Sequence, residues 1–152
     1  ATEMYTQWTS PSSEGKTGKV YKGFEAFVET SSITMVLTDQ GYADKQKVES
    51  LTVNPITVSF AKGTHANSVP TYYNNGTALR YYAGNTITFT GGVIRRIVVT
   101  APSANYSKLS ANQGVISIDG VTSTWEGNSD NVVLSGTGSG RMTKIVVTYE
   151  VQ

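Results

Sequence analysis

Residues 85–100, NTITFTGGVIRRIVVT, predict two β-strands separated by a pair of glycines. In the first strand, Ile87 and Phe89 point to one face and the threonines beside them point to the other, which is the period of two expected of a half-buried strand. In the second strand, Ile97 and Val99 likewise share one face. The two glycines interrupt the pattern, as turn residues do. This stretch therefore predicts β structure in which each strand buries one side.

Short strands of the same kind recur along the chain. Apolar, aromatic and β-branched residues fill segments bounded by Gly- and Asn-rich turns, and they predict strands at 20–29, 33–38, 48–53, 55–60, 114–119, 131–134 and 141–148. The last segment repeats the four residues IVVT of the segment 93–100. We interpret the two copies as central strands that meet the same need for burial.

No segment shows a sustained helical stripe. One or two helical turns are expected at 42–49, and a further turn is expected near 107–111. Many short strands separated by turn residues are typical of an all-β sandwich or barrel. We predict one all-β domain over residues 1–152, an antiparallel β-sandwich of the jelly-roll type, in which residues 1–37 form an N-terminal arm and strands.

Composition argues against several classes of function. The chain of 152 residues carries 12 basic and 11 acidic side chains, a net charge of +1. Binding to phosphate backbones usually needs a larger basic excess, so we expect no nucleic-acid partner. No apolar run approaches the roughly 20 residues of a membrane span, so we expect no membrane insertion. The lack of cysteine excludes disulfides and thiolate metal sites.

Six motifs between residues 38 and 149 follow one another in an order that resembles a known family. They are TDQGYADKQKV, ITVSFAKGT, PTYYNNGTALRYYAGNTITFTG, IRRIVVT, STWEGNSDNVVLS and RMTKIVVTY. In this order they resemble a β-sandwich module of secreted and cell-surface multimodular proteins from Bacteroidetes-type gut bacteria and, more loosely, carbohydrate-binding modules. The resemblance implies a bacterial protein, secreted or at the cell surface, tethered to other domains of a larger protein. It also implies a non-catalytic role in adhesion or carbohydrate binding.

Motifs for catalysis are weak. The single histidine, His65, stands in a loop, and no serine lies in a nucleophile-elbow motif. The acidic residues fall mostly at turns, strand ends and polar strand positions, where solvated carboxylates are normal, and no pair stands out as the two acids of a glycosidase. We therefore expect no enzyme, and we keep a small glycoside-active enzyme as a rival hypothesis.

Two oxygen-rich stretches raise the question of calcium. Residues 126–131, EGNSDN, offer oxygen donors at alternating positions, and Asp39 and Asp44 flank Gly41. The first stretch lacks the central glycine and the closing bidentate glutamate of an EF-hand loop, and a turn rich in turn-forming residues explains it better. We predict no cofactor and no metal-ligating residues, and a structural calcium ion stays an open alternative that the resemblance slightly favours.

Two tyrosine pairs flank the turn signal Asn74-Asn75-Gly76. Alternation along a strand splits each pair, so that one ring is expected in the core and the other on an outer face. An exposed ring suits the C–H patches of a sugar, and neighbouring Asn and Arg side chains suit its hydroxyl groups. The candidate ligand-binding residues are Tyr72, Tyr73, Tyr81, Tyr82, Arg80, Asn74, Asn75, Asn85, Trp8 and Tyr106. Packing of all the tyrosines in the core is the competing interpretation.

These observations lead to one main hypothesis and one alternative. The main hypothesis is a non-catalytic carbohydrate-binding module that recognises a polysaccharide by aromatic stacking and neutral hydrogen bonds. The alternative is a structural or adhesive spacer of a cell-surface protein without a glycan site. A secondary idea is an acidic sugar, which would be favoured if the IVVT strands are neighbours and the basic residues cluster: Arg80, Arg95, Arg96, Arg141 and Lys144.

Overall fold

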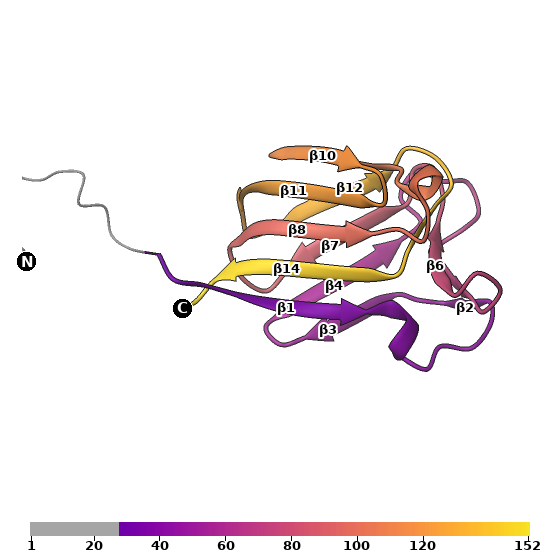
Figure 1. The fold of residues 1–152 in the computed structure, drawn as a ribbon, viewed down its shortest axis with the longest axis horizontal. Coiled ribbons are helices and arrows are strands. Elements are labelled where there is room, and N and C mark those ends of the chain that lie inside the picture. Colours follow the sequence, from indigo (N-terminus) through magenta and orange to yellow (C-terminus); the bar gives the residue numbers. More distant parts are fainter. Residues whose placement is uncertain (1–27) are drawn as a thin grey trace, which may run out of the picture.

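The protein is an all-β structure, as predicted. The computed structural model describes residues 28–152, which contain fourteen β-strands and two short 3-10 helices, η1 (Leu37–Asp39) and η2 (Ala104–Tyr106). The strands form three antiparallel sheets, two of five strands and one of four (Figure 1). Among the described residues no helix has the length and apolar character needed to cross a membrane.

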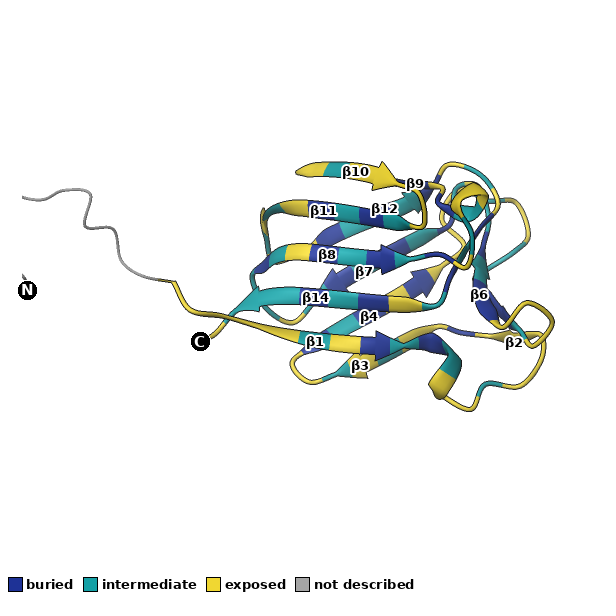
Figure 2. Cartoon of the chain, viewed as in Figure 1, coloured by how far each residue is buried: buried dark blue, intermediate teal, exposed yellow. Residues whose placement is uncertain are grey.

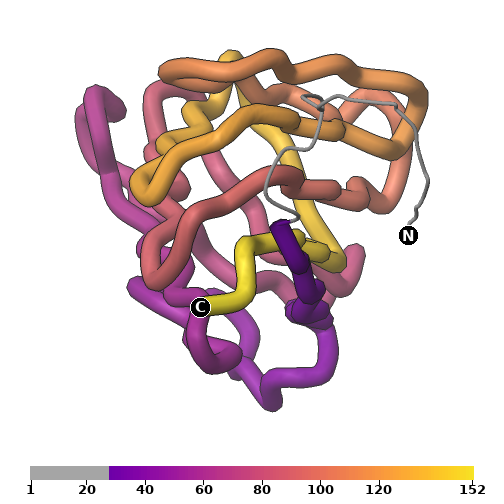
Figure 3. Tube along the Cα trace, turned by 90° about the vertical axis from the view of Figure 1, so that its left-hand side faces the viewer, coloured from indigo at the N-terminus to yellow at the C-terminus, as the bar shows by residue number. Residues whose placement is uncertain are grey.

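The first sheet carries both IVVT segments at its centre. In spatial order it contains β1 (Thr30–Val36), β14 (Lys144–Glu150), β8 (Ile94–Thr100), β11 (Thr122–Ser129) and β10 (Val115–Asp119). Val98 of β8 lies directly opposite Val146 of β14, so the two repeated segments are neighbours. In Figure 3 the indigo strand β1 and the yellow strand β14 run side by side, and their pairing extends from Thr30 opposite Glu150 to Val36 opposite Lys144.

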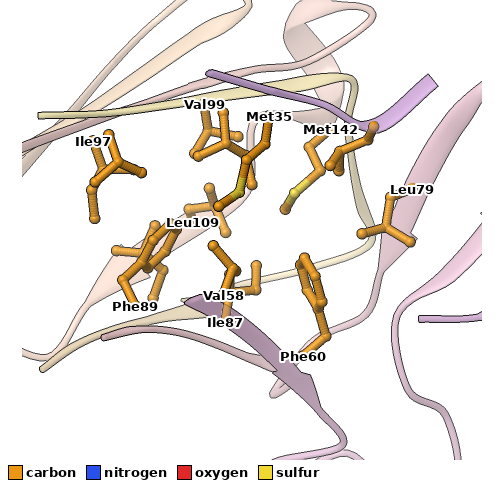
Figure 4. Close-up of a cluster of buried hydrophobic side chains, with 14 of the residues drawn as sticks. Met35, Val58, Phe60, Leu79, Ile87, Phe89, Ile97, Val99, Leu109 and Met142 are labelled. Atoms are coloured by element: carbon orange, nitrogen blue, oxygen red, sulfur yellow. The ribbon is translucent and has the colours of Figure 1, made fainter. Parts of the chain in front are cut away.

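The second sheet faces the first one. In spatial order it contains β3 (Ser50–Val53), β4 (Ile56–Ala61), β7 (Thr86–Thr90), β12 (Val132–Gly136) and β9 (Leu109–Ala111). The inward positions alternate along the strands, as in β4, where Ile56, Val58 and Phe60 are buried. Figure 4 shows side chains of both sheets meeting in one apolar layer, and Figure 2 shows buried positions concentrated on the central strands. The alternation seen in the sequence therefore produces a β-sandwich core.

The glycine pair that follows β7 carries the chain from the second sheet to the first. Gly91 has a φ of 109°, a value that disfavours other residues. A Cβ atom at this position would lie 2.0 Å from the carbonyl oxygen of Pro55. Because that oxygen belongs to the backbone and cannot move aside cheaply, only glycine fits the crossing between the sheets.

The small sheet closes one end of the sandwich. It contains β13 (Gly140–Met142), β6 (Ala78–Tyr81), β5 (Thr71–Tyr73) and β2 (Gln46–Lys47). Leu79 and Met142 are fully buried and belong to the same hydrophobic cluster as the two large sheets, and Figure 4 shows Met142 between Met35 and Leu79. The inner face of the small sheet is thus part of the core, which leaves its other face outward.

The structure corrects several details of the sequence prediction. Residues 42–49 contain no helical turn; they contain β2, whose Gln46 pairs with Tyr72 of β5. The turn near 107–111 is also wrong, because β9 occupies its end and the 3-10 helix η2 precedes it. The strand order does not confirm the jelly-roll type. The N-terminal arm and most of the strand expected at 20–29 lie outside the described residues.

Candidate functional site

The two tyrosine pairs lie on the small sheet, and alternation splits them as predicted. Tyr72 and Tyr81 are 4% and 1% exposed and belong to the core. Tyr73 and Tyr82 are half-buried and lie on the opposite, outward face. Two of the four predicted aromatic residues of this stretch therefore remain available at the surface, and the other two stabilise the sheet from within.

Two arginines share the outward face with these rings. Arg80 of β6 lies directly opposite Arg141 of β13 in the strand register, so both side chains leave the same side of the sheet. The guanidinium carbon of Arg80 lies 4.5 Å from the centre of the Tyr73 ring, and that of Arg141 lies 4.3 Å from the centre of the Tyr106 ring. These are cation–π distances. We call the set the tyrosine–arginine face: Tyr73, Arg80, Tyr82, Tyr106 and Arg141.

The hydroxyl groups of Tyr73 and Tyr82 lie 3.4 Å apart and link the two outward rings. Burial raises the pKa of Tyr82, and the neighbouring Tyr73 raises it further, while Arg80 acts in the opposite direction. The Tyr82 phenol therefore carries its proton at neutral pH, and the two neighbouring hydroxyl groups can donate and accept hydrogen bonds. Together with the guanidinium groups they make a surface rich in donors.

His65 extends the tyrosine–arginine face beyond Tyr82. The two rings lie 5.5 Å apart at an interplanar angle of 40°. The imidazole Nδ1 accepts hydrogen bonds from the backbone N–H groups of Asn67 and Ser68, at 3.2 and 2.9 Å. The Nδ1 atom is therefore unprotonated, and Nε2 carries the ring's hydrogen-bond donor. The loop position seen in the sequence did not indicate this placement beside an aromatic ring.

The turn between β5 and β6 borders the tyrosine–arginine face. Asn74 and Asn75 are exposed at its tip, as the sequence hypothesis requires of ligand contacts. The backbone N–H of Asn74 donates to Oδ1 of Asp44 at 3.0 Å, which ties the turn to the preceding loop. A Cβ atom at Gly76 would lie 2.7 Å from Nη1 of Arg141, so this guanidinium group rests against the turn.

Asn85 was predicted as an exposed ligand contact, and this prediction is wrong. It is completely buried, and its Oδ1 accepts a hydrogen bond from the backbone N–H of Tyr82 at 2.9 Å. Its Nδ2 donates to the carbonyl oxygens of Lys62 and Ser68, at 3.0 and 2.8 Å. With its amide fully occupied, Asn85 joins the loop of His65 to the end of β6 and is not part of the candidate site.

Of the two tryptophans, only Trp125 lies among the described residues. Trp8, which was predicted as a ligand-binding residue, lies outside the described residues. Trp125 is 1% exposed, and its Nε1 donates to the carbonyl oxygen of Gln113 at 2.6 Å, so it is a core residue. Tyr106, in contrast, is half-buried on η2 and belongs to the tyrosine–arginine face.

The basic residues divide into two groups and do not form the single cluster considered above. On the first sheet, Arg95 pairs with Glu150 at 3.0 Å and Arg96 approaches Glu126 at 3.8 Å. Arg80 and Arg141 lie on the small sheet. The neighbouring IVVT strands therefore did not bring all the cations together, because the strands that carry Arg80 and Arg141 belong to another sheet.

Between residues 28 and 152 no three His, Asp or Glu side chains are grouped closely enough to hold a metal ion. The oxygen-rich stretch 126–131 forms the end of β11 and the turn that follows it. There the hydroxyl of Ser129 accepts a hydrogen bond from the backbone N–H of Asn131 at 3.1 Å. A hydrogen-bonded turn accounts for the composition of this stretch.

The fold and the site define an all-β protein, a β-sandwich whose capping sheet carries an outward surface of tyrosine and arginine. Comparison with known proteins found no matching protein family, no matching curated protein and no matching solved structure.

Proposed function

We propose that the protein binds polysaccharide without cleaving it, through the tyrosine–arginine face. The observation that carries this proposal is the clustering on one outward sheet face of half-buried tyrosine rings whose partners are guanidinium groups. Aromatic rings stack on the apolar C–H patches of sugars, and the adjacent hydroxyl and guanidinium groups donate hydrogen bonds to sugar hydroxyls. In this proposal the protein serves as a binding module of a larger protein, secreted or at the cell surface.

The chemistry of the surface favours binding over hydrolysis. Glycoside hydrolysis requires two carboxyl groups that face each other across the substrate. The contacts within the tyrosine–arginine face are between rings, hydroxyls and guanidinium groups. The carboxylate of Asp44, which lies at the bordering turn, accepts a hydrogen bond from the backbone N–H of Asn74. The Nδ1 atom of His65 already accepts hydrogen bonds from two backbone N–H groups, so it is not free to take a proton from a substrate.

Affinity electrophoresis tests the proposal. The full chain migrates through gels that contain neutral or acidic plant and host polysaccharides, and retention by at least one of them is expected. Replacing Tyr73 and Tyr82 together by alanine removes two stacking rings and should weaken retention by about fivefold to a hundredfold, since each aromatic contact contributes about 0.5–1.5 kcal/mol beyond its buried area. Thermal unfolding confirms that the variant is folded.

Arg96→Gln provides the matched control, because Arg96 lies on the first sheet and away from the tyrosine–arginine face. Because the substitution changes the net charge, its mobility in each polysaccharide gel is compared with its own mobility in a gel without polysaccharide, and this retardation should equal that of the unaltered protein. If no polysaccharide retains the unaltered protein, the spacer function replaces the proposal. Release of reducing sugar by the purified protein would instead support the glycoside-active enzyme.

A further inference from the structure

In the described part of the chain, two of the four arginines lie near a glutamate and the other two do not. The chain has four arginines, at positions 80, 95, 96 and 141. Arg95 and Arg96 each lie within ion-pair distance of a glutamate. Among residues 28–152 no carboxylate pairs with Arg80 or Arg141, although these two face each other across β6 and β13. Like charges directly opposite on neighbouring strands destabilise a sheet, so this pair stands where an anion would be stabilising.

The contacts of Arg80 and Arg141 also hold the two groups ready for such an anion. Each guanidinium carbon lies over a tyrosine ring, at 4.5 and 4.3 Å from the ring centre, and Nη1 of Arg141 is further restrained by the turn at Gly76. A guanidinium group that lies over a ring has its N–H edges left for an in-plane acceptor. Because the side chains are already ordered, less conformational entropy is lost when they bind a ligand.

We propose that the polysaccharide bound at the tyrosine–arginine face is acidic, and that Arg80 and Arg141 bind the anionic groups of its sugars. This inference rests on the function proposed above and specifies its ligand. Carboxylate and sulfate groups share the required chemistry, since both present coplanar oxygen pairs that accept two parallel hydrogen bonds from a guanidinium group. The rings of Tyr73, Tyr82 and Tyr106 flank these anion contacts. One surface can therefore bind both the sugar rings and their charged groups.

Matched acidic and neutral polysaccharides separate the claim that the ligand is acidic from the claim that the protein binds polysaccharide. Isothermal titration of the full chain at about 0.15 M salt, where surface charges are screened beyond about 8 Å, uses four probes. Polygalacturonate carries carboxylates, its methyl ester is the neutral counterpart, dextran sulfate carries sulfates, and dextran is neutral. We expect polygalacturonate or dextran sulfate to bind about tenfold or more tightly than its neutral counterpart, which corresponds to one charge-assisted hydrogen-bond pair.

Variants assign that preference to the two arginines. Arg80→Gln and Arg141→Gln should each remove most of the difference between acidic and neutral probes. Arg80→Lys keeps the charge but loses the planar fork, and should recover only part of the preference. Arg96→Gln, which removes an equal charge from the first sheet, should retain the full preference.

Three outcomes would overturn the inference. Equal binding of acidic and neutral probes would reject the acidic ligand while leaving the proposed polysaccharide function intact, provided that the Tyr73 and Tyr82 double variant loses binding. No binding to any polysaccharide would reject both. A single-stranded oligonucleotide titrated in the same way is the fifth probe, and its binding more tightly than every polysaccharide would assign the arginine pair to phosphate recognition instead.

Discussion

At the scale of single residues, the hydroxyl of Tyr81 connects the core to the loop that carries Tyr106. It donates a hydrogen bond to the carbonyl oxygen of Tyr106 and accepts one from the backbone N–H of Lys108, both at 3.0 Å. Burial raises the pKa of Tyr81 to about 12, and the hydrogen bond from Lys108 opposes the rise. The buried Tyr81 therefore positions the half-buried Tyr106, although only Tyr106 lies at the surface.

The raised pKa of Tyr81 predicts a loss of stability at high pH. The folded protein holds the phenol proton more tightly than the unfolded chain, whose tyrosine pKa is 10.0, so the contribution is complete below pH 10 and is lost as the pH rises toward about 12. Urea unfolding at about pH 9 and about pH 11 should show a fall larger by roughly 1 kcal/mol in the unaltered protein than in Tyr81→Phe. Equal falls in the two proteins would contradict the assignment.

The buried amide of Asn85 is expected to contribute to the stability of the fold. Asn85→Ala leaves the backbone N–H of Tyr82 and the carbonyl oxygens of Lys62 and Ser68 without their partner. The free energy of unfolding should fall by about 2–4 kcal/mol, measured by urea denaturation. The exposed Asn75 of the β5–β6 turn supplies the control, since Asn75→Ala should change stability by less than about 0.5 kcal/mol. An unchanged free energy of unfolding in Asn85→Ala would show that the hydrogen bonds of this amide do not stabilise the fold.

Gly140 tests how closely β13 packs on the core tyrosine. A Cβ atom at this position would lie 2.1 Å from Cζ of Tyr81, whose ring is held by hydrogen bonds at its hydroxyl. Gly140→Ala should therefore lower the free energy of unfolding by about 1–3 kcal/mol, the usual cost of overpacking. In Gly138→Ala the added atom meets only the side chain of Lys108, at 3.7 Å, and thermal unfolding should detect little change. Similar melting temperatures for the two variants would contradict the packing described.

At the scale of elements, β10 is one of the two edge strands of the first sheet among the described residues, and it is mostly exposed (Figure 2). Val115 is 70% exposed and lies opposite Glu126 of β11. Exposed apolar edge strands favour pairing between chains, and a lysine on the edge prevents it. Val115→Lys should reduce aggregation at high concentration, measured by light scattering, with a melting temperature within about 2 °C of the original. A large fall in melting temperature would show that Val115 is buried by something else.

Elements with clear alternation could be predicted from the sequence, and elements defined by distant contacts could not. The period of two in 55–60 and 85–91 identified β4 and β7 because one side of each strand is buried. The two-residue strand β2 has no periodicity of its own and exists because Gln46 and Lys47 pair with β5. The polar stretch around it therefore suggested a helical turn where tertiary pairing imposes a strand.

The candidate site was predictable to the same extent. Alternation correctly separated Tyr72 and Tyr81 from Tyr73 and Tyr82, because that separation depends only on strand geometry. The meeting of Arg141 with Arg80 depends on the pairing of β13 with β6, which are distant in the sequence. Asn85 was predicted as a ligand contact and is buried, whereas His65 was not a candidate and lies beside Tyr82. Both differences arise because only the folded loop decides where these polar side chains lie.

At the scale of the whole molecule, two large sheets bury the apolar core, and the small sheet contributes one face to that core and leaves the other outward. A rigid platform of this kind holds rings and guanidinium groups in fixed relative positions, which lowers the entropic cost of binding a polymer. In this account the sandwich provides stability, and recognition belongs to the outward face of its cap.

The most direct measurement is a nuclear magnetic resonance titration of the full chain with oligogalacturonate and, separately, with a sulfated dextran oligosaccharide, following tyrosine ring and arginine Nε–H signals. We predict that the signals of Tyr73, Tyr82, Arg80 and Arg141 shift together and saturably, while that of Arg96 on the first sheet stays in place. Shifts confined to the first sheet, or no saturable shift on the tyrosine–arginine face with either ligand, would contradict the account.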